Sequence, residues 1–281
     1  MAVTGNIKIL AENQWDLASL TLNDGTAVAS LPLSNTQFYS NEEIARIAST
    51  SATIVANLDK RYQISTFNLY RHNLSNTATV QVQYYSGENG TGELVLDSGV
   101  LKAIPAKSLG ELNWPLDKLV PSAFDDWHLR FTSYDHDYVI ARSIKITIVD
   151  ADNEQGYIDI TRFYVGKAFR PAYNFSYGAG LSWLNSDNQQ RSAGGGMFAS
   201  ASSAYRQIGL SLNYLQPKDR NELSRIRRIA GNNKDVFVSM YPNRGGALEI
   251  EHTMAGMFSD TNAINSTFNN NFTHSLTLLE V

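Results

Sequence analysis

Regular alternation of apolar and polar residues is the feature that most constrains this chain. In one run the two kinds of side chain occupy successive positions: Ala78, Val80, Val82 and Tyr84 alternate with Thr79, Gln81 and Gln83. A second run places isoleucine at 144, 146 and 148, separated by Lys145 and Thr147. Successive side chains of a strand point to opposite faces, so each run predicts a strand with one buried and one wet face, as in antiparallel sheets.

Many other segments have the composition of short strands. The further strands that we expect cover residues 62–70, 93–97, 127–132, 157–165, 205–215, 236–241, 247–254 and 272–279. Clusters of Ser, Gly, Asn and Asp, such as those at 86–90 and 150–153, separate them and favour turns. A series of short strands joined by turns is typical of sandwiches and barrels, so the predicted fold class is mainly β.

One segment, residues 217–230, has the signals of an α-helix instead. Pro217 suits the first helical position, acidic residues follow in the first turn, and Gly231 can end the helix. Leu223 and Ile226 are spaced to share one face, and arginines lie near the end, where the helix dipole favours cations. A weaker helical pattern covers residues 41–47.

Composition excludes several classes of function. The 281 residues include no cysteine, which excludes disulfides, thiol nucleophiles and cysteine-ligated zinc. The net charge of −4 predicts no general affinity for nucleic acid or anionic lipid. No apolar stretch approaches the ~20 residues that cross a bilayer. The N-terminus lacks the basic start and apolar run of a signal peptide. We therefore expect that the protein is made in the cytoplasm and does not insert into a membrane.

A connector at residues 166–174 predicts two domains, 1–166 and 167–281. Beyond it, residues 184–203 are rich in Asn, Ser, Gly and Ala, which predicts a long mobile loop. Arg191 and the glycine run Gly194, Gly195 and Gly196 lie in this loop. Because few large apolar side chains are present to order it, we predict an assembly loop that a neighbouring subunit orders. The alternative is a disposable linker.

Several pieces of the first domain occur in a recognisable order. They are residues 67–75, 78–85, 96–99, the Trp114-Pro115 pair, 144–148 and 156–166. On these pieces, residues 1–166 resemble the galactose-binding-like (discoidin-like) jelly rolls of bacteriophage tail proteins. The resemblance implies an N-terminal jelly-roll β-sandwich, followed by a second β-rich domain that carries the single helix 217–230.

The second domain also resembles phage tail-tip or baseplate proteins. The matching pieces are Pro171, Asn174, Tyr177-Gly178 and Trp183, then a polar stretch with glycines, an alternating strand, the helix and another strand. The resemblance implies a distal-tail-like structural protein of the tail tip or baseplate, located in the virion. Such a protein assembles as a homo-oligomer into a symmetric ring and contacts other phage tail and baseplate proteins.

A carbohydrate-binding module that recognises a host-surface glycan is the alternative function, because the resembled fold occurs in glycan binders. Trp114 and Trp127 are the candidate glycan contacts. Trp127 begins an alternating apolar face, which favours a place in the core over a glycan contact. Trp114 precedes a proline in a loop, where either role is open.

Sequence motifs give no support to an enzyme. The chain contains no G-x-S-x-G, H-E-x-x-H or P-loop motif, so we expect no catalytic residues, no metal site and no cofactor. We interpret Asp135, His136 and Asp137 as a solvated turn between strands. The aspartates at 125–126 and at 150 and 152 likewise suit solvated turns better than a glycosidase pair or a calcium loop.

Overall fold

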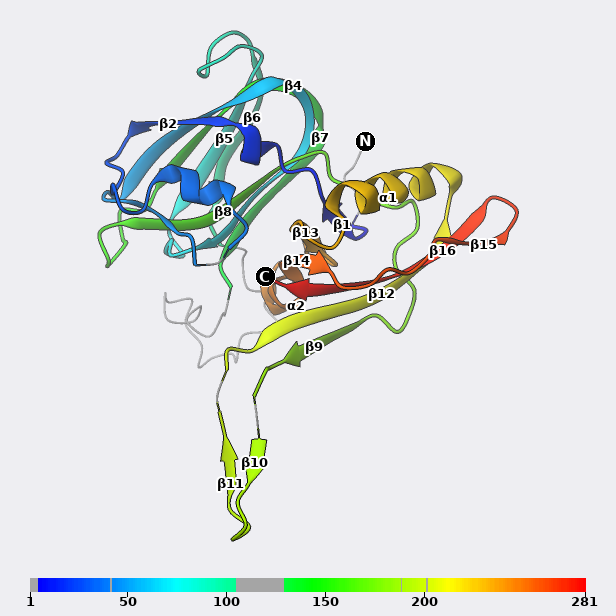
Figure 1. Cartoon of the computed structure of the whole chain (residues 1–281). Helices are drawn as coiled ribbons and strands as arrows, with labels where there is room; N and C mark the ends of the chain where they lie inside the picture. The colour runs from blue at the N-terminus through cyan, green and yellow to red at the C-terminus, as the bar shows by residue number, and fades with distance from the viewer. Residues whose placement is uncertain (1–4, 41, 105–128, 188, 201) are drawn as a thin grey trace, which may run out of the picture.

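The computed structural model describes residues 5–40, 42–104, 129–187, 189–200 and 202–281. Within them the chain is mainly β, as predicted. Strands form two seven-stranded antiparallel sheets and one two-stranded sheet (Figure 1). We call the body around the first sheet the N-terminal sandwich and the body around the second sheet the C-terminal unit.

The N-terminal sandwich is a jelly-roll sheet folded around its own core, which confirms the predicted fold. Its strands are β2 (Ser19–Asp24), β3 (Ala45–Ile47), β4 (Ser51–His72), β5 (Thr79–Tyr85), β6 (Leu94–Lys102), β7 (Phe131–Val149) and β8 (Ile158–Gly166). They are ordered β3-β8-β4-β7-β5-β6, and β2 pairs with the first half of β4. The short 3-10 helices η1 (Gln14–Leu17) and η2 (Leu33–Gln37) pack at one side.

The alternating runs bury the predicted faces. Strand β5 pairs with β7 so that Val80 faces Ile148, Val82 faces Ile146 and Tyr84 faces Ile144, and all six side chains are fully buried. The helix predicted at residues 41–47 is wrong, because residues 45–47 form strand β3 and pair with β8. Ala45 and Ile47 bury there, so a long-range pairing overrides the local helical pattern.

The C-terminal unit begins with a strand from the other end of the chain. Its sheet contains β1 (Lys8–Leu10), β9 (Gly180–Leu184), β12 (Tyr205–Leu215), β13 (Val236–Ser239), β14 (Thr253–Phe258), β15 (Asn265–Phe268) and β16 (Asn271–Glu280). Strand β1 pairs with β13, and Ile7 and Ile9 are buried in the core of this unit. The domain boundary at residue 166 stays a prediction. Strand β1 precedes this boundary in the sequence but belongs to the second sheet.

Two helices belong to the C-terminal unit. Helix α1 (Pro217–Ala230) has the predicted bounds, and its Leu223 and Ile226 bury against the sheet. Helix α2 (Gly246–Glu251) is an addition to the single predicted helix and occupies most of the strand predicted at 247–254. Gly245 and Gly246 both have positive φ, which turns the chain into this helix. No helix among the described residues is long and apolar enough to cross a membrane.

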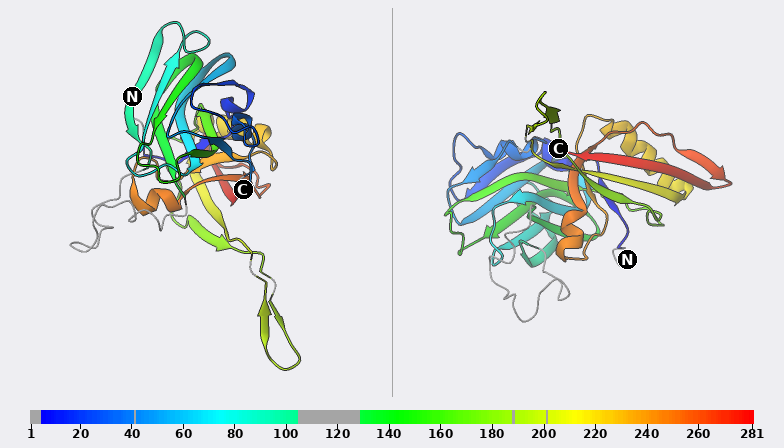
Figure 2. Two further views of the ribbon diagram at one scale, coloured as in Figure 1. Left: turned by 90° about the vertical axis from the view of Figure 1, so that its left-hand side faces the viewer. Right: turned by 90° about the horizontal axis from the view of Figure 1, so that it is seen from below.

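The predicted loop at 184–203 contains a β-hairpin. Strands β10 (Gln189–Arg191) and β11 (Met197–Ala199) pair, and the hairpin projects away from both bodies (Figures 1 and 2). The turn closes because Gly195 adopts φ +85° and its amide donates to the Ser192 carbonyl at 2.9 Å. We call residues 189–199 the arm. The expectation of an unstructured loop is therefore corrected for these residues, since cross-strand backbone hydrogen bonds order them.

Ionic networks and a shared core join the two bodies. Aromatic residues from both sides pack in one buried cluster, with Tyr70 and Tyr164 of the sandwich against Phe237 of β13. Arg162 of β8 binds Asp235 of the C-terminal unit at 3.0 Å, with both side chains buried. Glu280 of β16 is shared between the sandwich and its own unit, because its carboxylate binds both Arg71 and Arg206.

Candidate functional site

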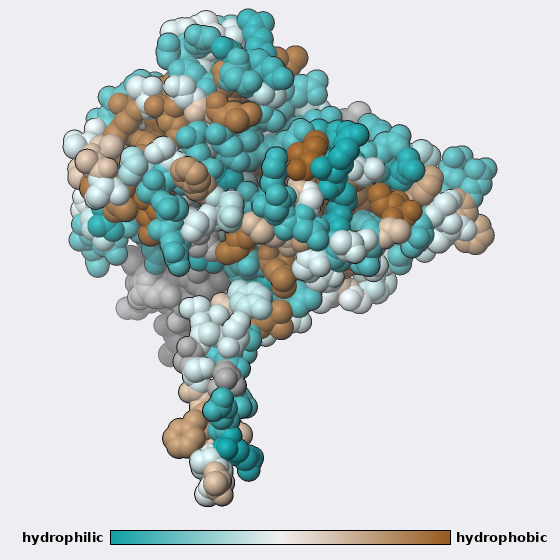
Figure 3. Space-filling model, in the orientation of Figure 1, coloured by the Kyte–Doolittle hydropathy of each residue, from teal (hydrophilic) through white to brown (hydrophobic). Residues whose placement is uncertain are grey.

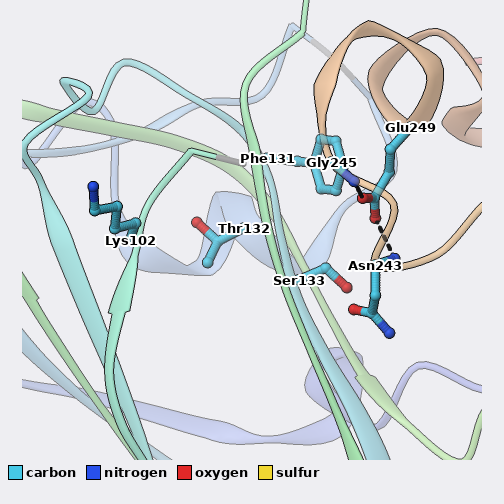
Figure 4. Close-up of a pocket in the computed structure, with 7 residues that line it drawn as sticks. All are labelled: Lys102, Phe131, Thr132, Ser133, Asn243, Gly245 and Glu249. Atoms are coloured by element: carbon cyan, nitrogen blue, oxygen red, sulfur yellow. Dashed lines mark hydrogen bonds between the residues drawn. The ribbon is translucent and has the colours of Figure 1, made fainter. Parts of the chain in front are cut away.

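A polar cleft lies between the two bodies (Figure 4). It encloses about 280 Å³. The sandwich and the C-terminal unit both contribute to its wall, which consists of Lys102, Phe131, Thr132, Ser133, Asn243, Gly245 and Glu249. The Glu249 carboxylate is buried and accepts the backbone amides of Asn243 at 3.0 Å and Gly245 at 2.7 Å. Glu249 therefore serves to hold the loop before α2, and its oxygens are already engaged.

The Asp135 carboxylate, predicted to be solvated, is buried in the structure. It lies in β7 and contacts the Nζ of Lys8 at 3.1 Å and the guanidinium of Arg170 at 2.8 Å. Burial by itself would raise the pKa of Asp135, but these two cations outweigh it and lower the pKa to about 2. The solvated-turn interpretation is wrong here, because β1 brings Lys8 across from the start of the chain.

Lys8 is the reciprocal partner of Asp135. Its ammonium is fully buried and also donates to Asn68 Oδ1 at 2.9 Å and to Ser133 Oγ at 2.8 Å. Burial lowers the pKa of Lys8, while the charge of Asp135 opposes that shift. All three ammonium protons can find acceptors in this arrangement, so the charge is compensated. The cluster joins β1 to β4 and β7 and has a structural role.

The turn at 150–153 is held by Asp150. Its carboxylate is buried and accepts the backbone amide of Ser75 at 2.9 Å and the side-chain amide of Asn153 at 3.0 Å. The expectation of a solvated Asp150 is therefore wrong, whereas Asp152 is exposed. In the part of the chain that the structure describes, no group of three or more His, Asp or Glu side chains is placed to hold a metal ion.

The predicted glycan contacts Trp114 and Trp127 lie outside the described residues, as do the aspartates at 125–126. Their roles stay predictions. The predicted assembly residues are in place on the arm: Arg191 ends β10, and Gly194, Gly195 and Gly196 form the turn between β10 and β11. These four residues are all exposed. Their part in assembly also stays a prediction.

A second hollow, at the far end of the C-terminal unit, was not predicted. It encloses about 480 Å³ and is lined by Tyr173, Tyr214, Leu215, Gln216, Asn270 and Asn271, which we call the aromatic hollow. The two tyrosine rings are 6.4 Å apart and inclined at 65°. One sequence signal pointed to it: the adjacent apolar pair Tyr214-Leu215 breaks the alternation of β12.

No protein-family model matches this chain, and no curated protein matches it. Among solved structures, a GH29 fucosidase of Ruminococcus gnavus in complex with fucose overlaps at 18% identity and a TM-score of 0.38, covering 56% of this chain and 27% of the fucosidase. A fucose-binding module of Streptococcus pneumoniae overlaps at 12% identity and a TM-score of 0.37, covering 56% of this chain and 95% of the module.

A family 32 carbohydrate-binding module of C. perfringens in complex with galactose gives a similar result. Its identity is 14% and its TM-score 0.36, and the overlap covers 56% of this chain and 98% of the module. This chain thus spans about a quarter of the fucosidase and nearly all of the two modules. No function follows from overlaps of this size.

Proposed function

We propose that the protein is a structural subunit that assembles with other subunits through the arm. The observation that carries this proposal is the exposure of all six strand residues of β10 and β11, including Met197 at 58% and Phe198 at 67%. A lone two-stranded hairpin is only marginally stable in water. Burying a Met or Phe side chain contributes roughly 1.5–3 kcal/mol, which a partner surface can supply.

The sheet next to the arm offers a flat polar face. Strand β9 leads into the arm and β12 leads out of it, while α1 covers the opposite face of the same sheet (Figure 1). A shallow hollow of about 300 Å³ on the uncovered face is lined mainly by small residues: Gly178, Gly180, Ser182, Gln207, Gly209, Leu210, Ser211, Ser275, Leu276 and Thr277. Such a face suits contact with another protein, because small side chains let a partner approach closely.

Outside the arm, the two bodies of the molecule are held together by buried contacts. Two buried ion pairs, Lys8–Asp135 and Arg162–Asp235, and an aromatic cluster hold the N-terminal sandwich against the C-terminal unit. On the surface, apolar residues are scattered among polar ones, and the arm combines both kinds (Figure 3). Two bodies joined by buried contacts, with one extended arm, match the needs of a repeating subunit in a closed ring.

We further propose that the assembly is the tail tip or baseplate of a bacteriophage. The sequence resemblance of both halves to phage tail proteins supports this part of the proposal. Under this proposal the protein lies in the virion tail as a homo-oligomeric ring and contacts neighbouring tail proteins.

Light scattering on the purified chain tests the assembly proposal. We expect concentration-dependent oligomers that the double variant Met197→Ser, Phe198→Ser abolishes without changing the melting temperature. Val100→Ser is the matched control, because Val100 is 73% exposed on β6 of the sandwich and lies outside the arm. Trypsin should cleave rapidly near Arg191 in the monomer and slowly in the oligomer. A chain that stays monomeric, or an arm variant that assembles normally, would overturn the proposal.

Carbohydrate binding is the second candidate function. The aromatic hollow favours it, because two exposed tyrosine rings stand beside uncharged amide side chains. This function is compatible with assembly, since the hollow and the arm lie at different parts of the C-terminal unit (Figure 1).

A further inference from the structure

The aromatic hollow depends on an irregularity in β12. Side chains of this strand are buried at positions 206, 208, 210 and 212, so regular alternation would bury Tyr214 next. The pairing with β16 instead shifts between Leu212 and Leu215, and Leu215 becomes the buried residue. A bulge of this kind re-aims side chains and is over-represented beside binding sites. It turns the Tyr214 ring outward, to 62% exposure.

The segment between β8 and β9 supplies the second ring. Tyr173 is 57% exposed and meets Tyr214 edge to face. Asn270, at φ +58°, forms the turn between β15 and β16, and Gln216 precedes the first residue of α1. Three chain segments thus bring two aromatic rings and amide side chains to one place.

The polar groups of the hollow are available. Among the described residues, no hydrogen bond engages the Tyr173 or Tyr214 hydroxyl or the side-chain amides of Gln216 and Asn270, and Gln216 leaves the start of α1 uncapped. Amides and hydroxyls both donate and accept. The six lining residues include no carboxylate, ammonium or guanidinium. A ligand that fits must therefore be uncharged, rich in hydroxyls and able to present an apolar face to a ring.

We infer that the aromatic hollow binds a neutral sugar, and this inference rests on the second candidate function. A pyranose has a face of C–H groups that packs on an aromatic ring and a rim of hydroxyls that pairs with amides. The volume of about 480 Å³ lies within the roughly 300–1,000 Å³ of small-molecule sites. The site belongs to the C-terminal unit.

Calorimetric titration with a defined sugar panel tests the inference. The panel contains galactose, fucose, glucose and N-acetylglucosamine with their oligosaccharides, and sialic acid as the charged comparison. We expect binding of at least one neutral sugar, weakened tenfold or more by Tyr173→Ala and by Tyr214→Ala. Tyr214→Phe keeps the ring and should retain most of the affinity. Tyr177→Ala is the matched control, because Tyr177 is fully exposed in the same unit and does not line the hollow.

The outcomes separate the two claims. The site is supported if the amide NMR signals of Gln216 and Asn270 shift and saturate with added sugar and if both alanine variants lose sugar affinity. If Tyr173→Ala and Tyr214→Ala bind the sugar as tightly as Tyr177→Ala does, the site is overturned while carbohydrate binding survives. If no panel sugar binds at a concentration of about 10 mM, which is tenfold above a millimolar Kd, both the site and carbohydrate binding are overturned.

Discussion

At the scale of single residues, Asp135 is a buried carboxylate on which the folded state depends. Its buried carboxylate compensates two cations, Lys8 and Arg170. We expect Asp135→Asn to lower the free energy of unfolding by about 3–5 kcal/mol, because the change leaves buried charges unpaired. Urea denaturation measures this. Glu154→Gln, at an exposed position in the turn between β7 and β8, should change the value by less than about 0.5 kcal/mol. Equal effects of the two changes would contradict the structural role of Asp135.

His72 makes stability depend on pH. Burial, aided by the charge of Arg130, lowers the pKa of His72 to about 3, and its Nδ1 accepts the Leu74 amide at 3.3 Å. The folded-state pKa lies below the unfolded value of about 6.5, so the contribution is complete above pH 6.5 and is lost as pH falls towards 3. Relative to His72→Gln, the natural chain should lose about 2 kcal/mol more between pH 6.5 and 5. Parallel pH curves from urea denaturation would contradict this.

At the scale of elements, the close approach of β14 and β16 depends on Gly256. A Cβ atom there would lie 2.6 Å from the carbonyl oxygen of Leu279. We expect Gly256→Ala to destabilise the protein by about 1–3 kcal/mol through overpacking, measured by thermal unfolding. Gly209→Ala in neighbouring β12 is the matched change, because its Cβ would meet nothing within 4 Å. That variant should be unchanged or up to about 1 kcal/mol more stable. The reverse order would show that β14 and β16 pack differently.

At the scale of the whole molecule, the buried contacts between the two bodies predict cooperative unfolding. Asp235 accepts from Arg162 at 3.1 Å and from the Tyr164 hydroxyl at 2.6 Å, both across the junction. Asp235→Ala should therefore lower the stability of both bodies by a similar amount, about 3 kcal/mol. Hydrogen exchange followed by mass spectrometry can read β7 and β12 separately. If only β12 loses protection, the two bodies unfold independently and the ionic networks do not couple them.

The elements whose signals are local could be predicted from the sequence. The period-2 runs predicted which faces of β5 and β7 are buried, and the proline, acidic and glycine signals predicted helix α1 with its bounds, 217–230. These predictions succeeded because alternation and capping depend on neighbours along the chain. The mainly β fold class follows from the same signals.

Which segments meet could be learned only from the folded chain. Strand β1 pairs with β13, more than 200 residues away, and this pairing buries Lys8 beside Asp135. Helix α2 and the pairing of β3 with β8 likewise replace the strand and the helix that the local patterns predicted. The physical reason is that periodicity reports which face of an element is apolar, whereas the partner of that face depends on packing between distant segments.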